Sequence, residues 1–152
     1  MVLFIDGDAL VNLLKPIIFK SIERLKLKTY VISNKKISIG KSPLISYIIV
    51  GKGIDEADHH IVKLVQKNDI VITSDIPLSD RIVSKGAYAI DHRGTLYNKE
   101  NIKSHLAIRN LMQEIRDSGE KTKGPAPFGK KDIHNFATTF NNFLAKLLRE
   151  NR

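Results

Sequence analysis

The stretch Val2-Leu3-Phe4-Ile5-Asp6-Gly7-Asp8 decides the fold of this 152-residue chain. It is a short apolar run that ends in aspartates, and a second run, Ile70-Val71-Ile72-Thr73, leads to Asp75 in the same way. Apolar runs without alternation are typical of parallel strands that are buried on both faces. Helical patterns lie between the two runs, so the sequence predicts an α/β fold with a mostly parallel sheet.

The remaining patterns alternate between strand and helix up to residue 90 and are helical from residue 98 onward. Further strands are expected at 29–33, 44–50 and 88–90, and helices at 9–26, 56–67, 77–85 and 99–118. Pro16 should kink or restart the first helix, and Asp132 could cap a last one. No strand is predicted after residue 90. The pattern predicts three α/β/α layers followed by C-terminal helices.

The length of the chain and the placement of its Gly and Pro residues predict one domain with a tail. A chain of 152 residues is long enough for one core that buries most of its apolar surface, and too short for two. Residues 119–131 form a basic loop rich in Gly and Pro, whose backbone cannot be regular. We therefore expect an α/β domain at 1–118, this loop, and a helix at 132–152 that packs on the same domain.

The charge balance indicates an anionic partner. Lys and Arg number 25 against 16 for Asp and Glu, a net charge of +9 that favours nucleic acid or a membrane surface. No apolar run is long enough to span a membrane and the chain begins with a strand pattern rather than a signal peptide, so a cytoplasmic location is expected. The absence of cysteine excludes disulfides and thiolate zinc sites. The basic residues expected to contact a nucleic-acid backbone are Lys15, Arg93, Arg109, Lys121, Lys123, Lys130 and Lys131.

Several aspartates are placed where a parallel sheet would bring them to one edge. Asp6, Asp8 and Asp75 follow the two predicted strands, and ligands of open α/β sheets bind at that edge. Asp55 and Asp58 lie at the start of an intervening helix and share one of its faces. Clustered carboxylates resist joint ionisation, so they usually imply a bound cation, here Mg²⁺ or Mn²⁺.

These residues also have structural interpretations. Asp8 could cap the first helix, and Asp-x-x-Asp at a helix start is itself a capping pattern. The hydroxyls of Thr73 and Ser74 could hold the Asp75 carboxylate or a metal-bound water in place. The five histidines form no ligand set in the sequence, so none is predicted to be a catalytic base.

Three motifs in one order give the chain a resemblance to a known family. They are Ile5-Asp6-Gly7-Asp8-Ala9 with Asn12 and Lys15, then Gly53-Ile54-Asp55-Glu56-Ala57-Asp58, then Val71-Ile72-Thr73-Ser74-Asp75-Ile76-Pro77-Leu78. In these motifs the chain resembles the bacterial YaiI/YqxD family (UPF0178, DUF188), which is related to PIN-like nucleases. The likeness covers nearly the whole chain, including Arg93-Gly94, Arg109 and the tail from Gly124-Pro125 to Phe136.

The resemblance implies a Rossmann-like, PIN-like α/β/α domain whose acidic cluster binds Mg²⁺ or Mn²⁺ for phosphodiester hydrolysis. RNA is the more frequent substrate of such proteins than DNA. By this likeness, Asp6, Asp58 and Asp75 are the catalytic acids. Asp8 and Asp55 are additional metal ligands or support the ligands from behind, and Asn12, Thr73 and Ser74 support them as well.

Two other functions stay open at this point. A haloacid-dehalogenase-like phosphatase also starts with an apolar strand that ends in Asp-x-Asp. Its late acidic pair, however, follows a Thr/Ser strand, whereas Asp55 and Asp58 precede Thr73-Ser74-Asp75. The third possibility is a non-catalytic RNA-binding or structural module in which the acids hold a structural ion. Metal-dependent cleavage of RNA would distinguish a nuclease from both.

Overall fold

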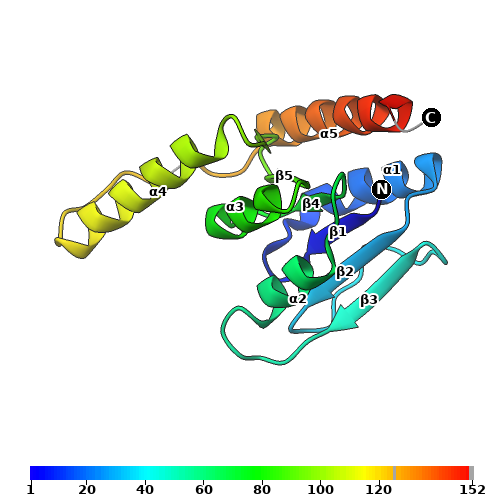
Figure 1. Ribbon diagram of the computed structural model, residues 1–152, viewed down its shortest axis with the longest axis horizontal. Helices are drawn as coiled ribbons and strands as arrows, with labels where there is room; N and C mark the ends of the chain where they lie inside the picture. The colour runs from blue at the N-terminus through cyan, green and yellow to red at the C-terminus, as the bar shows by residue number, and fades with distance from the viewer. Residues whose placement is uncertain (125, 151–152) are drawn as a thin grey trace.

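Six strands form one sheet in the order β3-β2-β1-β4-β5-β6 (Figure 1). The computed structural model describes residues 1–124 and 126–150. Parts of the predicted loop and of the predicted last helix, at Pro125 and at residues 151–152, therefore lie outside the described residues. The strands are β1 (Leu3–Asp6), β2 (Thr29–Ser33), β3 (Ile45–Ile49), β4 (Ile70–Ile72), β5 (Tyr88–Ile90) and β6 (Leu96–Tyr97). Strands β1 to β5 are parallel, and β6 pairs antiparallel with β5. The predicted mostly parallel α/β sheet is confirmed.

Helices cover both faces of this sheet, as predicted for three layers. They are α1 (Lys15–Leu25), α2 (Glu56–Leu64), α3 (Ile76–Ser84), α4 (Ile102–Asp117) and α5 (Lys130–Glu150). Successive side chains of a strand point to opposite faces. Leu3 and Ile5 of β1 accordingly lie in one apolar cluster with α1 and α5, and Phe4 lies in a second cluster with α2 and α3.

The first helix begins later than the predicted residue 9. Residues Gly7–Ala9 and Asn12–Leu14 form two 3₁₀ turns, and α1 starts at Lys15 with Pro16 in its first turn. Proline is well tolerated there because the first N–H groups of a helix have no partner within the helix. Pro16 therefore starts the helix and does not kink it.

Several other elements also differ from the prediction. The two-residue strand β6 was not expected, because so short a segment carries no periodicity. Helix α4 begins at Ile102 rather than residue 99. Helix α5 begins at Lys130, so Asp132 lies inside its first turn, where Oδ2 accepts a hydrogen bond from the Gly129 backbone N–H at 3.0 Å.

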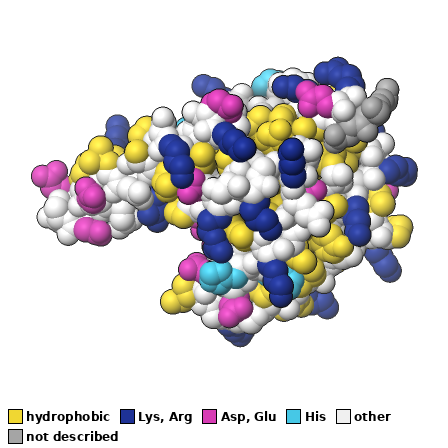
Figure 2. All heavy atoms as spheres, viewed as in Figure 1, with side chains coloured by type: hydrophobic (Ala, Val, Ile, Leu, Met, Phe, Trp, Pro, Cys, Tyr) yellow, Lys and Arg dark blue, Asp and Glu magenta, His cyan; other side chains and the backbone are white. Residues whose placement is uncertain are grey.

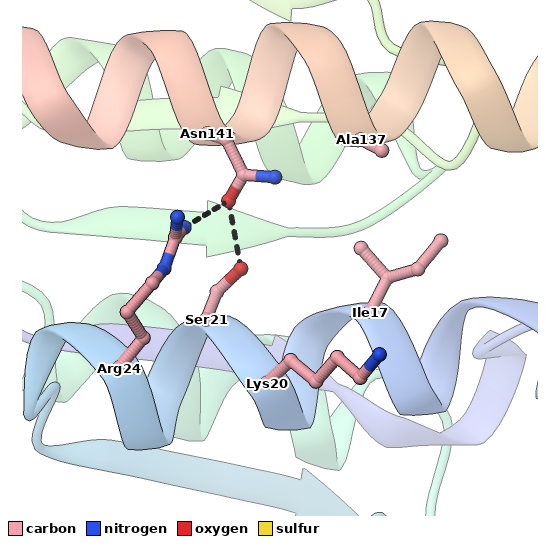
Figure 3. A pocket seen from close by; sticks show the side chains of 6 residues that line it. All are labelled: Ile17, Lys20, Ser21, Arg24, Ala137 and Asn141. Carbon is pink, nitrogen blue, oxygen red and sulfur yellow. Dashed lines mark hydrogen bonds between the residues drawn. The ribbon is translucent and has the colours of Figure 1, made fainter.

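The last helix completes the core beneath the first strand. Phe136 and Phe140 of α5 are fully buried, their rings are stacked 5.1 Å apart, and they share a cluster with Leu3 and Ile5. Figure 3 shows the contact between α1 and α5, where Asn141 Oδ1 accepts hydrogen bonds from a serine and an arginine of α1. A cavity of about 480 Å³ between these helices includes none of the predicted site residues in its lining.

Helix α4 extends away from the rest of the molecule as an arm (Figure 1). Ile102 at its base is buried, whereas Ile108 and Leu111 farther along are 60% and 55% exposed. In Figure 2, Lys and Arg side chains are spread over the body, and acidic side chains gather at the end of this arm. Within residues 1–124 and 126–150, no helix combines the length and hydropathy that a bilayer crossing requires.

Candidate functional site

The strand order reverses at β1, and the predicted acids lie at this point. The chain builds outward from β1 to β2 and β3, then returns to the other side of β1 with β4 and β5. In open α/β sheets such a switch point leaves a crevice outside the carboxyl ends of the strands, where ligands bind. Asp6 is the last residue of β1, and Asp75 is the N-cap of the helix that follows β4.

Asp6 is a buried carboxylate with one side-chain partner. It is 7% exposed, and its Oδ2 accepts a hydrogen bond from the Thr73 hydroxyl at 2.9 Å. Burial raises the pKa of Asp6; the Thr73 hydrogen bond opposes this, and the charges of Asp8 and Asp75 add to it. Gly7 follows without a side chain because a Cβ there would lie 2.7 Å from Ile37 Cδ1. The chain can therefore turn closely around Asp6.

Asp75 is held by the helix that it starts. Its Oδ1 accepts a hydrogen bond from the Leu78 backbone N–H at 2.9 Å, and its own backbone N–H donates to the Thr73 hydroxyl at 3.1 Å. Thr73 thus joins Asp6 to Asp75, but it contacts the Asp6 carboxylate and the Asp75 backbone rather than the Asp75 carboxylate.

Asp58 joins this pair from the first turn of α2. Burial, the charges of Asp75, Asp6 and Asp55, and a hydrogen bond with the Asp75 carboxyl together raise its pKa to about 7. A hydrogen bond between two carboxyl groups requires a proton on one of them. The carboxylates of Asp75 and Asp6 therefore lie close enough to Asp58 to favour its protonated form.

The other two predicted ligands have different surroundings. Both carboxylate oxygens of Asp8 accept from the Asn34 backbone N–H, at 2.8 and 3.1 Å, so Asp8 ties the first turn to the end of β2 rather than capping α1. Asp55 precedes α2 with a left-handed backbone (φ 62°), is exposed, and makes no side-chain capping bond. The capping interpretation of Asp8 and Asp55 is therefore wrong, although the charges of both act on the central acids.

The oxygen ligands and the charge at this edge suit a hydrated divalent cation. Among residues 1–124 and 126–150, no three His, Cys, Asp or Glu side chains are arranged as a complete ligand set. Mg²⁺ usually takes only one or two carboxylates and fills its remaining positions with water or substrate phosphate. The pair formed by Asp58 and Asp75, which lies beside Asp6, offers that number of carboxylates. The assignment of a metal, and of all five aspartates to it, stays a prediction.

Among the described residues, the side chains of Ser74 and Asn12 make no hydrogen bond to the acids. Ser74 Oγ is instead 3.1 Å from Nδ1 of His92, and Asn12 is exposed in the second 3₁₀ turn. His92 is a residue that the sequence interpretation set aside. It is 6% exposed, and burial lowers its pKa while the charge of Asp91 opposes the change. The signal for His92 was its place just after β5, at the same edge as the acids.

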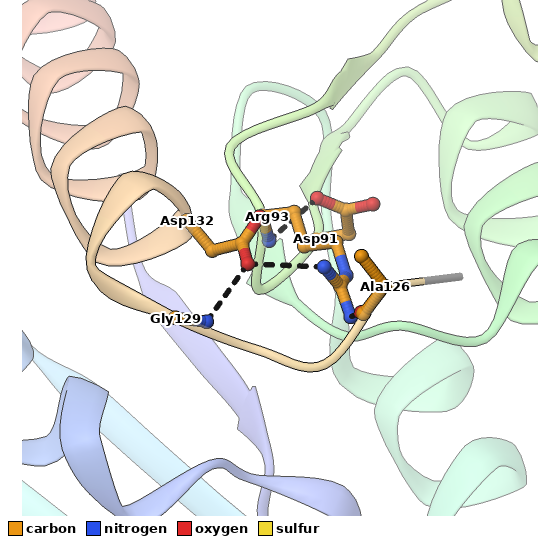
Figure 4. A network of polar contacts seen from close by, with 5 residues as sticks. All are labelled: Asp91, Arg93, Ala126, Gly129 and Asp132. Carbon is orange, nitrogen blue, oxygen red and sulfur yellow. Dashed lines mark hydrogen bonds and ion pairs between the residues drawn. The ribbon is translucent and has the colours of Figure 1, made fainter.

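Arg93 fastens the basic loop to this edge of the sheet (Figure 4). Its guanidinium forms an ion pair with Asp132 at 3.0 Å and donates to the Ala126 carbonyl at 2.7 Å. It also lies 5.7 Å from the centre of the Phe128 ring. Arg93 is thus already paired, whereas five other predicted nucleic-acid contacts are exposed and Lys15 is half-buried. The exposed ones are Arg109, Lys121, Lys123, Lys130 and Lys131.

The raised pKa of Asp58 predicts an unusual dependence of stability on pH. Between 3.8, the ordinary pKa of the carboxyl, and about 7, the folded state retains a proton that the unfolded chain releases. The contribution of Asp58 to stability is therefore complete below this window and is lost as the pH rises through it. In EDTA, Asp58→Asn should lose less stability than the wild type between about pH 5 and about pH 8.

Urea unfolding at the two pH values measures this difference. Asp117→Asn, an exposed acid at the end of α4, is the matched control and should follow the wild type. Parallel pH profiles for Asp58→Asn and the wild type would show that Asp58 does not carry the raised pKa.

Comparisons with known proteins agree with the resemblance seen in the motifs. The DUF188 family, described as "Uncharacterized BCR, YaiI/YqxD family", matches residues 4–146. UPF0178 proteins from Sulfurimonas denitrificans and a Sulfurovum species are 64% and 67% identical over 146 residues; both alignments cover 96% of this chain, and 97% and 99% of the relatives. A UPF0178 protein from a Nitratiruptor species is 58% identical over 147 residues, 97% of each chain. No solved structure matches. The chain belongs to the YaiI/YqxD family of UPF0178 proteins.

Proposed function

We propose that this protein is a Mg²⁺- or Mn²⁺-dependent nuclease that hydrolyses phosphodiester bonds, with RNA preferred over DNA, in the cytoplasm. The observation that carries the proposal is the convergence of Asp6, Asp58 and Asp75 at the switch point of the sheet. The charge of Asp75 raises the pKa of Asp6, and the charges of Asp75 and Asp6 raise the pKa of Asp58. Perturbed carboxyls in such a crevice are the usual mark of a catalytic or metal site.

Each acid has a distinct part in the proposed reaction. Asp6 and Asp75 are oriented, the first by the Thr73 hydroxyl and the second by the N-terminus of α3. Asp58, with a pKa of about 7, can take a proton from an attacking water near neutral pH. A bound divalent cation would neutralise the carboxylates and polarise the phosphoryl oxygens. The chain itself supplies the fixed oxygens and the proton acceptor.

The basic surface supports a polyanionic substrate. The chain carries +9 overall although its candidate site is acidic. Lysines that contact phosphates raise the affinity for a nucleic acid of any base sequence, and such binding weakens as the salt concentration rises. The exposed lysines of the 119–131 segment are joined to the site edge by the contacts of Arg93 with Ala126 and Asp132. This segment is our proposed backbone contact.

Divalent cations should stabilise the wild-type protein. Binding at a tenfold excess over Kd contributes about 1.4 kcal/mol, which corresponds to a rise in Tm of roughly 3–6 °C for a domain of this size. Thermal melts in Mg²⁺ or Mn²⁺, compared with NaCl of equal ionic strength, measure the effect. The same samples are then incubated with single-stranded RNA, with and without EDTA.

The outcomes separate the proposed function from its alternatives. An unchanged Tm and intact RNA at millimolar metal would contradict the nuclease. Salt-sensitive binding of RNA without cleavage would indicate a non-catalytic RNA-binding module. Turnover of p-nitrophenyl phosphate through an aspartyl-phosphate would indicate the phosphatase, although Asp8, the second acid of that motif, is occupied by the Asn34 N–H.

A further inference from the structure

A second cavity adjoins the acidic edge. It measures about 340 Å³, within the range of small-molecule sites of about 300–1,000 Å³. Its lining includes Ala9, which follows Asp8, and Ser74, which precedes Asp75. The cavity is therefore one residue away from the acids on two different segments. None of the three proposed catalytic acids is part of its lining.

One part of the wall is flat, aromatic and fixed in place. Phe128 lies against the Arg93 guanidinium, and both line the cavity together with Val11. The ion pair of Arg93 with Asp132 and its bond to the Ala126 carbonyl hold this arrangement. Aromatic rings and arginine planes are the surfaces on which unpaired bases of single-stranded RNA stack.

Another part of the wall is formed by the buried side chain of His92. His92 lines the cavity with its Nδ1 beside Ser74 Oγ, and its buried Nε2 has no hydrogen-bond partner among the described residues. A buried polar atom without a partner costs about 1–3 kcal/mol, so its presence calls for an explanation. Burial lowers the pKa of His92, so a neutral ring offers one donor and one acceptor nitrogen.

The charges around the cavity disfavour an anion. Asp132 neutralises the guanidinium of Arg93, and Asp91 is also part of the lining. Asp8 and Asp75 are the chain neighbours of the lining residues Ala9 and Ser74. A phosphate in this cavity would be repelled, whereas a neutral planar ring with polar edges would meet stacking surfaces and hydrogen-bonding groups.

We infer that this cavity binds an unpaired nucleobase of the substrate, so that the phosphate attached to that nucleotide reaches the neighbouring carboxylates. The inference rests on the proposed nuclease function, whose substrate it specifies as a single-stranded or locally unpaired nucleic acid. A base inside a duplex could not enter the cavity without leaving its stack.

The test measures binding without cleavage. Uridine and adenosine 5′-monophosphates are titrated in EDTA by amide NMR shifts, against ribose 5-phosphate as the base-free probe. Val11→Phe fills the cavity, and Leu13→Phe is the matched control, because Leu13 is 57% exposed and is not in the lining. We expect saturable binding of the nucleotides, weakened about tenfold or more by Val11→Phe or Phe128→Ala. Leu13→Phe should bind like the wild type.

Three results would overturn the inference. They are no saturable nucleotide binding at roughly 10 mM, equal binding of ribose 5-phosphate, and unchanged affinity in a folded Val11→Phe variant. The proposed nuclease can fail separately: nucleotides would then bind in EDTA, but added metal would produce no cleavage of RNA.

Discussion

Asp75→Asn is expected to reduce metal-dependent cleavage of RNA by roughly a hundred- to a thousandfold, the scale for losing one preorganised electrostatic group from an active site. The carboxylate is the partner of Asp58 and lies beside Asp6, so its charge affects both. Asparagine retains an oxygen for the Leu78 N–H and is as good an N-cap as aspartate. The substitution therefore removes the charge while it preserves the start of α3.

Two further variants separate charge from structure. Asp75→Ala also removes the cap, which should lower the free energy of unfolding by about 1 kcal/mol. Asp80→Asn removes a charge from the same helix, where the carboxylate pairs with Lys103 at 2.8 Å, and should retain wild-type cleavage. Rates of cleavage in Mn²⁺ and urea unfolding in EDTA are measured for all three. If Asp75→Asn retains cleavage within tenfold of the wild type, the carboxylate is not a catalytic group.

Phe140→Ala should lower the free energy of unfolding by about 3–5 kcal/mol, as is usual when a buried aromatic ring is deleted. The ring is fully buried, stacks on Phe136, and belongs to the cluster that contains Leu3 and Ile5. Because domains are stable by only about 5–15 kcal/mol, this loss could remove most of the stability. Urea unfolding followed by circular dichroism measures it.

Thr138→Ala is the control for this variant, since Thr138 is exposed on the same helix. Its unfolding free energy should stay within about 0.5 kcal/mol of the wild type. A loss below about 1 kcal/mol for Phe140→Ala would mean that α5 does not share the core with β1.

Features set by local pattern could be predicted from the sequence. The strands at Leu3 and Ile70 were found because buried parallel strands are continuously apolar. The edge position of Asp6 and Asp75 followed from the same runs, because parallel strands end on one side of a sheet.

Features that depend on contacts between distant segments could not be predicted. The Arg93–Asp132 ion pair joins residues 39 positions apart, and the bond from the Asn34 N–H to Asp8 spans 26. The spacing of these residues in the sequence predicts neither contact. His92 is likewise buried beside residues that are distant in the sequence, such as Val11, Ser74 and Phe128, so the sequence showed only an isolated histidine.

The position of α5 has a consequence for synthesis on the ribosome. Strand β1 must wait for β4 to complete its pairing in the sheet and for α5, which follows all six strands in the chain, to cover Leu3 and Ile5. Until then an apolar sheet face is exposed to solvent, and such surfaces promote aggregation of partly made chains. A nascent chain that stops before Lys130 should therefore bind chaperones or aggregate, even though the proposed acids are already present in it.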